Sequence, residues 1–208
     1  MTELGLFPLG MVLLPTEQVP LHIFEPRYRE LVSECVEEER PFGLVFADDD
    51  GLREVGTEAT VVEVVDRFED GRLNIVVEGG ERFRLVELTS GRSFHTGEIE
   101  PLVEEDDPAD PGDREHLLTL FARLVELTGA EVELPIEDDV PLSFLVASRF
   151  ELAPELKQEL LQERSERTRL RRLREILERA AAAVERQREI AVRAQRNGHY
   201  PPDSGPAS

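Results

Sequence analysis

The chain has 208 residues, with 45 acidic and 24 basic side chains and a formal net charge of −21. This length suits one domain or two small ones, and it allows roughly 70% of the unfolded surface to be buried without a metal or disulfide. The acidic balance argues against a nucleic-acid partner, because phosphate binding requires a local excess of Lys and Arg. Cys35 is the only cysteine, so no internal disulfide forms and no cysteine cluster exists to hold a metal.

The N-terminus does not have the pattern of a signal peptide. Its apolar run, residues 4–14, follows acidic Glu3, is interrupted by Pro8 and is followed by Pro15 rather than by a small-residue cleavage site. No stretch of the sequence approaches the roughly 18 apolar residues that a membrane helix requires. We therefore predict a cytoplasmic protein with no membrane partner.

Residues 1–104 predict a β-rich subdomain. Short apolar runs separated by turn residues are typical of strands, and here they cover residues 18–24, 42–47, 58–68, 73–78, 83–88 and 93–103. Asp70-Gly71 is a favoured hairpin turn, and Gly79-Gly80 predicts a second tight connection. Because no helices alternate with these runs, their spacing favours a small twisted barrel over a parallel sheet.

One helix interrupts the strands at residues 26–38. Tyr28, Leu31 and Cys35 recur at helical spacing, and Pro26 suits a first helical turn, where its missing N–H is tolerated. Cys35 is therefore predicted to pack in the core as a small hydrophobic residue.

Residues 105–112 form an acidic, proline-broken linker, and residues 113–198 predict a helical subdomain. Its helices are expected up to Gly129 and at residues 142–151, 155–163 and 165–197, with Ser165 as the N-cap of the last and longest. Residues 199–208 predict a disordered tail. An apolar stripe on the long helix could pack on the bundle or form a homodimer; it comprises Leu170, Leu173, Leu177 and Val184.

No motif for chemistry emerges. The phosphate-binding G-x-x-x-x-G-K-[ST] loop is absent, and Ser93 with His95 lacks both the second glycine of a nucleophile elbow and an orienting acid. The acidic turn at residues 48–51 does not fit a calcium loop, and the four histidines are scattered. We therefore predict that the protein is not an enzyme and binds no cofactor or metal.

Several segments in a specific order resemble the Lon protease N-terminal domain family. They are FPLG (residues 7–10), VPLHIFEPRYR (19–29), VGTEA (55–59), VEGGERFR (77–84), LSF (142–144) and KQELLQ (157–162), followed by Arg169, Leu170 and Leu173. The resemblance covers residues 4–195. It implies an α+β protein: an N-terminal PUA-like β-barrel subdomain with one helix, then a C-terminal helical subdomain ending in a long helix.

The resemblance also implies a stand-alone, non-catalytic substrate-binding domain of protein quality control, without the ATPase and protease modules of full-length Lon. Its expected partners are unfolded or tagged polypeptides, with a protease or chaperone as a further partner. Such a site needs exposed apolar surface, and Phe7, Met11 and Phe24 are the candidates for it. Core packing is the alternative for each of the three.

Two other binding functions remain open. PUA-like barrels are often RNA modules, but residues 1–112 carry 27 acidic and 9 basic side chains, which opposes phosphate binding. The long helix is basic, although its Arg and Glu residues alternate as in a solvated, salt-bridged helix. The third hypothesis is a pocket for a small molecule or a degradation tag.

Overall fold

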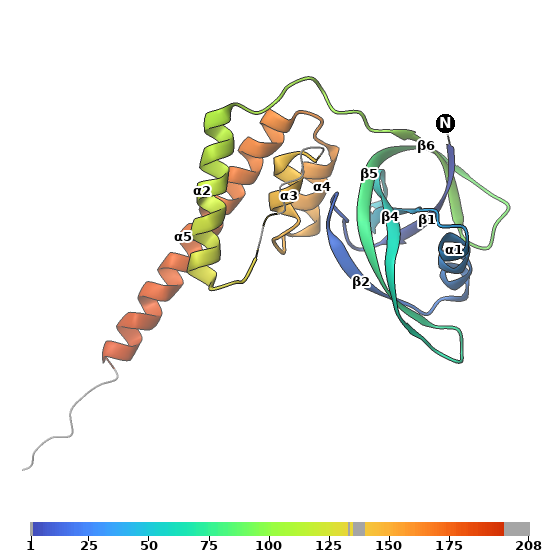
Figure 1. Cartoon of the computed structure of the whole chain (residues 1–208), viewed down its shortest axis with the longest axis horizontal. Helices are drawn as coiled ribbons and strands as arrows, with labels where there is room; N and C mark the ends of the chain where they lie inside the picture. The colour runs from blue at the N-terminus through green and yellow to red at the C-terminus, as the bar shows by residue number, and fades with distance from the viewer. Residues whose placement is uncertain (1, 133, 135–139, 198–208) are drawn as a thin grey trace, which may run out of the picture.

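The computed structural model describes residues 2–132, 134 and 140–197 and consists of a barrel beside a group of helices (Figure 1). The barrel elements are β1 (Thr2–Leu9), β2 (Gln18–Ile23), α1 (Pro26–Glu37), β3 (Phe42–Asp48), β4 (Gly51–Arg67), β5 (Leu73–Thr89) and β6 (His95–Pro101). The helical subdomain contains α2 (Pro111–Thr128), α3 (Leu142–Ala147), α4 (Pro154–Gln162) and α5 (Glu166–Asn197). The α+β prediction, with a β-rich first half and a long last helix, is confirmed.

The strands form one sheet in the order β2-β5-β4-β3-β1-β6, and an additional β5–β6 pairing closes it into a barrel. The first half of β5 pairs with β2 and the second half with β6, so β2 extends the barrel wall as an edge strand. The prediction of a tight connection at Gly79-Gly80 is wrong, because both glycines lie inside the continuous strand β5. A Cβ on Gly79 would lie 2.1 Å from the Leu14 carbonyl oxygen, so close backbone approach explains this glycine.

Strand β1 begins at Thr2 and overlaps the apolar run 4–14, where no alternation indicates a strand. Its residues Leu4, Leu6 and Phe7 are buried, and a Cβ on Gly5 would lie 2.4 Å from Leu31 of α1. One face of β1 therefore contacts the barrel interior and the other contacts α1. A strand buried on both faces has a continuous apolar sequence, which hides the two-residue period.

Cys35 of α1 is a core residue, as predicted. It is 3% exposed, its Sγ donates to the Pro41 carbonyl at 3.7 Å, and burial raises the pKa of its thiol from 9.0 to about 11. Between these two values the unfolded thiol ionises while the folded thiol keeps its proton. This group therefore lowers the stability of the native state as the pH rises from 9 to 11.

The raised pKa predicts an unreactive thiol. At pH 8 the native chain should react with a thiol reagent ~100-fold or more slowly than the urea-unfolded chain, because a pKa rise of about two units removes that fraction of thiolate. A time course of labelling with and without urea measures this ratio. Equal rates in the two states would show that Cys35 is accessible and ionised in the native fold.

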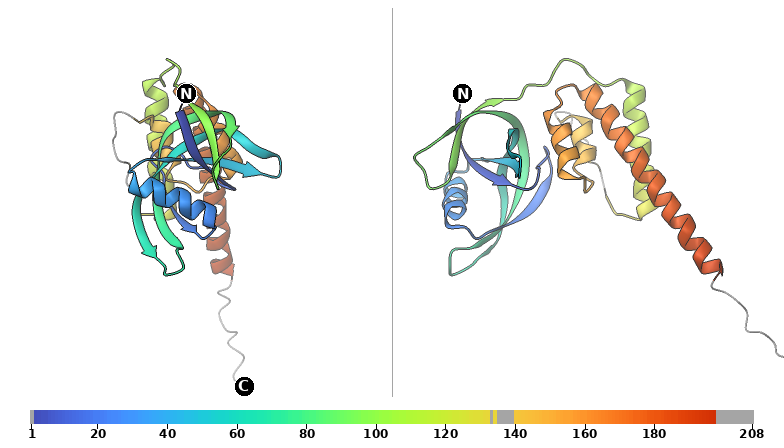
Figure 2. Two further views of the ribbon diagram at one scale, coloured as in Figure 1. Left: turned by 90° about the vertical axis from the view of Figure 1, so that its right-hand side faces the viewer. Right: turned by 180° about the vertical axis from the view of Figure 1, so that it is seen from behind.

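The helical subdomain begins with α2 packed beside α5, and α5 extends past the end of α2 away from the barrel (Figure 2). Gly129 ends α2 in the left-handed conformation, with a φ of 68°. The Ser165 hydroxyl accepts the Thr168 N–H at 3.0 Å, which confirms the predicted N-cap of α5. Helix α3 is shorter than predicted, because Arg149 and Phe150 donate to carbonyls three residues earlier and tighten the chain into a turn.

The two subdomains share one hydrophobic core. Val12, Leu14, Phe46 and Val55 of the barrel half belong to the same buried cluster as the inner faces of α2–α5. The stripe residues Leu170, Leu173 and Leu177 lie in this cluster with at most 1% exposure. These three leucines pack within their own chain, so the homodimer hypothesis loses the side chains on which it mainly rested.

The segment predicted as a linker is held in place by ion pairs. The Asp107 carboxylate accepts hydrogen bonds from the Ser165 hydroxyl at 2.7 Å and from the Arg167 guanidinium at 2.8 Å, and both hold its pKa below the usual range. Helix α2 starts at Pro111, inside the predicted linker. The predicted tail, residues 199–208, lies outside the described residues. No helix among the described residues is long and apolar enough to cross a membrane.

Candidate functional site

Three aromatic rings gather at the end of the barrel where β2 and the β4–β5 hairpin meet. We call His22, Phe24 and Phe68 the aromatic cluster: the His22 ring is stacked 6.0 Å from Phe24 and lies edge-on 6.3 Å from Phe68. Phe24 is 60% exposed and Phe68 is 39% exposed. Exposed apolar side chains are ordinary when they occur singly, but a cluster of aromatic rings is typical of a contact surface.

Local structure holds this cluster in position. The His22 imidazole is 2.6 Å from the Asn74 side-chain oxygen on the neighbouring strand, and the guanidinium of Arg72 lies 5.1 Å above the Phe68 ring. The Phe68 N–H donates to the Arg72 carbonyl at 3.0 Å and closes the predicted Asp70-Gly71 hairpin. The two phenylalanines are thus presented to solvent on a paired strand end and a closed turn.

The structure separates the three predicted site residues. Phe24 belongs to the aromatic cluster, whereas Met11 is partly buried against the barrel core. The prediction for Phe7 as exposed surface is corrected: Phe7 is 6% exposed, and its ring is stacked 4.1 Å from that of Tyr28, because α1 packs over β1. A binding role for Phe24 or Met11 stays a prediction.

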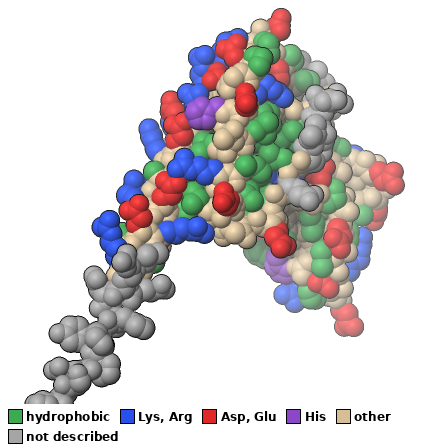
Figure 3. All heavy atoms as spheres, turned by 60° about the vertical axis from the view of Figure 1, so that its left-hand side comes forward, with side chains coloured by type: hydrophobic (Ala, Val, Ile, Leu, Met, Phe, Trp, Pro, Cys, Tyr) green, Lys and Arg blue, Asp and Glu red, His purple; other side chains and the backbone are tan. Residues whose placement is uncertain are grey.

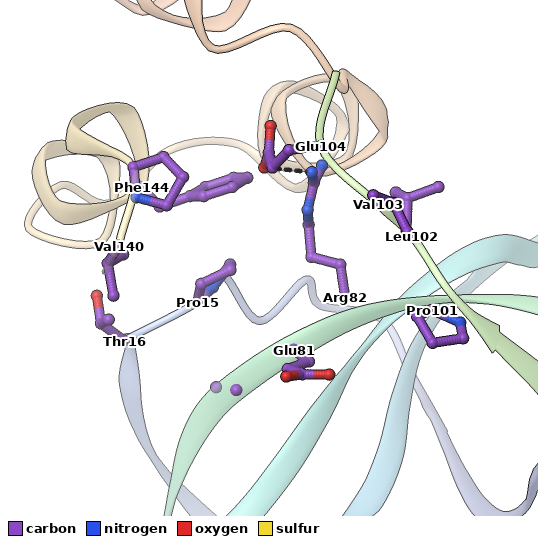
Figure 4. A pocket seen from close by; sticks show the side chains of 13 residues that line it. Pro15, Thr16, Glu81, Arg82, Pro101, Leu102, Val103, Glu104, Val140 and Phe144 are labelled. Atoms are coloured by element: carbon purple, nitrogen blue, oxygen red, sulfur yellow. Dashed lines mark hydrogen bonds and ion pairs between the residues drawn. The ribbon is translucent and has the colours of Figure 1, made fainter. Parts of the chain in front are cut away.

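A second feature is a pocket of about 480 Å³ between the barrel and α3 (Figure 4). Its lining is mostly apolar and includes Pro15, Pro101, Leu102, Val103, Pro141 and Phe144, with Thr16 and the Gly79-Gly80 backbone at the barrel side. This volume lies within the range of about 300–1,000 Å³ that is common for ligand sites. We call it the inter-subdomain pocket.

Buried charges form one wall of the inter-subdomain pocket. The Arg82 guanidinium reaches from β5 and donates to the carbonyls of Leu161 at 2.6 Å and Glu163 at 2.8 Å, and to the Glu104 carboxylate. Burial lowers the pKa of Arg82 to about 10, which still leaves it charged at neutral pH. Arg169 of α5 donates to the same Glu104 carboxylate, so this network fixes the helices against the barrel.

The residues considered for catalysis do not assemble. The Ser93 hydroxyl donates to Glu30 at 2.7 Å, and Ser93 forms no hydrogen bond with His95 within the described part of the chain. In the acidic β3–β4 turn, whose sequence does not fit a calcium loop, the Asp48 carboxylate forms an ion pair with Arg53. Within residues 2–132, 134 and 140–197 no group of three His, Cys, Asp or Glu side chains could hold a metal ion.

Sequence reasoning missed Phe68 and the inter-subdomain pocket. An apolar residue directly before the turn Glu69-Asp70-Gly71 was a usable signal for Phe68, since that position projects from a hairpin end. The pocket had no such signal, because its walls come from chain segments as far apart as Pro15 and Phe144.

The fold, the exposed aromatic cluster and the apolar pocket define a scaffold with surfaces suited to binding. Residues 3–179 match the family model of the ATP-dependent protease La (LON) substrate-binding domain, and the chain belongs to this family.

Comparisons with individual proteins agree with this family assignment. The chain is 30% identical over 168 residues to the Lon protease of Paraburkholderia phytofirmans and 29% identical over 136 residues to that of Parabacteroides distasonis. These matches cover 73% and 61% of this chain but only 21% and 16% of the relatives, so the chain spans about a fifth of the length of these curated relatives.

Two solved structures are similar over nearly their whole length. The crystal structure of a Lon N-terminal domain protein from Xanthomonas campestris aligns with a TM-score of 0.64 and 29% identity, covering 83% of this chain and 97% of that one. The N-terminal domain of a Mycobacterium avium complex Lon protease aligns with a TM-score of 0.67 over 85% and 98% of the two chains. Its 18% identity supports the fold alone.

Proposed function

We propose that this protein is a non-catalytic polypeptide-binding module, which engages unfolded or tagged polypeptides in the cytoplasm. The observation that carries the proposal is the aromatic cluster, with Phe24 60% exposed on the barrel surface. Unfolded chains expose the apolar side chains that folded proteins bury, so an exposed aromatic surface complements them. Membership of a family described as a substrate-binding domain supports the same function.

The relatives support a partner that processes the bound polypeptide. They are Lon proteases about five times as long as the segment that this chain matches, so a protease or a chaperone is the partner class that we propose. In this arrangement the chain recruits polypeptide and contributes no reacting group.

Substitution of the aromatic cluster tests the proposal. Phe24→Ser combined with Phe68→Ser should weaken binding of a labelled, permanently unfolded polypeptide about tenfold or more, because aromatic anchors contribute most of the binding energy in such contacts. Fluorescence anisotropy titrations measure the change. Ile190→Ser is the matched control, since Ile190 is 67% exposed in the C-terminal part of α5, the helix whose end points away from the barrel in Figure 1.

Both variants replace exposed side chains, so their melting temperatures should stay near that of the native chain. Equal affinity of the native chain and the Phe24→Ser/Phe68→Ser variant would show that the aromatic cluster is not the binding surface. Absence of saturable binding by the native chain would overturn the proposed function itself.

RNA binding is the alternative function, and a parallel titration with labelled RNA tests it. Arginines and acidic residues are interspersed along α5 (Figure 3), and Arg167, Arg172 and Arg174 already form ion pairs within the chain. Arginines in ion pairs are poorly available to phosphates. A labelled RNA oligonucleotide titrated at the same salt concentration is therefore expected not to bind.

A further inference from the structure

The aromatic cluster and the inter-subdomain pocket lie at opposite ends of β2. Phe24 directly follows the last residue of β2, whereas Thr16, at the pocket, lies two residues before the first. At about 3.3 Å per residue the six residues of β2 cover about 20 Å. An extended polypeptide of about six or seven residues has the length to join the two features.

Outward-facing side chains of three paired strands fill the surface between them. Across β2, β5 and β4 the rows are Gln18, Glu78 and Thr60; Pro20, Val76 and Glu63; and His22, Asn74 and Asp66. The buried residues Ile75 and Val77 alternate with them on β5 and face the barrel interior. We call the three carboxylates Glu63, Asp66 and Glu78 the acidic track.

The acidic track has no cation of its own. No Lys or Arg occupies the nine outward positions, and none of the three carboxylates forms an ion pair among the described residues. Gln18 donates to Glu78 at 2.6 Å and Asn74 donates to Asp66 at 2.9 Å. These neutral amides orient the carboxylates and leave their negative charge uncompensated.

The face of β2, and not its free edge, is the surface open to a partner. Pro20 lies in the middle of β2 and has no N–H to donate, which makes this edge a poor template for an added strand. Side-chain contacts across the outer face do not require that N–H. A partner here is therefore recognised by its side chains.

We propose that the acidic track selects extended polypeptide segments that have an apolar residue at each end and Lys or Arg between them. One apolar residue packs on the aromatic cluster, the other enters the inter-subdomain pocket, and the basic residues pair with the acidic track. This inference rests on the proposed function. It adds the class of polypeptide that is bound and the path of the bound segment along β2.

Labelled peptides with two Phe residues test the charge and the spacing separately. The native chain should bind a peptide with a Lys-rich linker of about six residues at least tenfold more tightly than one with a Glu-rich linker. The ratio of the two affinities, Lys-rich over Glu-rich linker, should fall as salt is added, because exposed ion pairs are screened. A peptide with a two-residue Lys linker should bind like a peptide with a single Phe, because it is too short to reach both features.

Neutral variants of the track provide the matched comparison. Glu63→Gln with Glu78→Gln should weaken binding of the long Lys-linked peptide by about two- to five-fold per charge, the range expected for exposed ion pairs. Glu87→Gln with Glu98→Gln removes two charges from β5 and β6, outside the acidic track, and should change this affinity less than two-fold. Val103→Asp, at an exposed position of the pocket, should reduce binding of the long peptide to the level of the single-Phe peptide.

The outcomes separate the two proposals. Equal affinity for Lys- and Glu-linked peptides, or equal loss in the two double variants, would overturn the acidic track while polypeptide binding stands. Unchanged binding by Val103→Asp would remove the pocket from the proposal. If the native chain binds none of the peptides and no unfolded polypeptide, the proposed function fails and the acidic track fails with it.

Discussion

Leu173→Glu is expected to unfold the helical subdomain. Leu173 is 0% exposed in the core that the barrel shares with the helices, and a Glu carboxylate there would be buried without a cation. Truncation of such a leucine to alanine alone costs about 2–5 kcal/mol, and burial of an unpaired charge adds to it. The loss therefore approaches or exceeds the whole free energy of unfolding of a typical domain, about 5–15 kcal/mol.

Circular dichroism melting and sedimentation velocity together check this result. Ile190→Glu on the exposed part of the same helix is the control, and it should change the free energy of unfolding by less than about 0.5 kcal/mol. A Leu173→Glu variant that melts like the native chain but sediments as a smaller species would identify an oligomer interface instead of a core.

Arg169→Ala is expected to lower the free energy of unfolding by about 3–5 kcal/mol. Arg169 is 0% exposed and donates to the Ser143 hydroxyl at 2.7 Å, the Glu163 carbonyl at 2.6 Å and the carboxylates of Glu104 and Glu166. Its guanidinium also lies 4.2 Å from the centre of the Phe144 ring. Removal of this one cation leaves the largely buried Glu166 carboxylate with no ion pair among the described residues, and leaves Arg82 as the remaining donor to Glu104 and to the Glu163 carbonyl. Removing one partner in this way is the costly way to break a buried ion pair.

Urea unfolding of Arg169→Ala measures this loss, and Arg171→Ala is its control. Arg171 is on the same helix with a half-exposed side chain, and its 3.5 Å contact with Asp113 is a surface ion pair worth at most about 1 kcal/mol. Equal stability of the two variants would mean that the buried network does not hold the subdomains together. Because Phe144 also lines the inter-subdomain pocket, the loss of Arg169 should weaken binding of the long Lys-linked peptide as well.

Local sequence patterns predicted most of the elements. The helix at residues 26–38, the Asp70-Gly71 hairpin, Gly129 at the end of α2 and the Ser165 N-cap all occur, because caps, turns and amphipathic periods depend on neighbouring residues. Local patterns failed to predict a strand that is buried on both of its faces. Strand β1 showed no alternation, since the barrel interior and α1 bury both of its faces.

The Gly79-Gly80 pair shows a second limit of local reading. Two adjacent glycines indicate a turn when only the neighbouring residues are considered. In the fold the strand continues through them, because the Leu14 carbonyl passes so close to Gly79 that a side chain has no room. The contact partner is 65 residues away in sequence, so no local pattern reports it.

The sequence by itself determined the α+β class, the acidic charge, the division into a strand-rich and a helix-rich half, and the resemblance to a Lon substrate-binding domain. Only the tertiary structure decided which apolar side chains stay in solvent: Phe24 is exposed and Phe7 is buried, although both are phenylalanines in segments that carry the resemblance. It also brought Pro15, Arg82 and Phe144 around one pocket and aligned the carboxylates of β4 and β5 beside β2. Exposure and adjacency depend on what packs against each residue, and those neighbours come from distant parts of the chain.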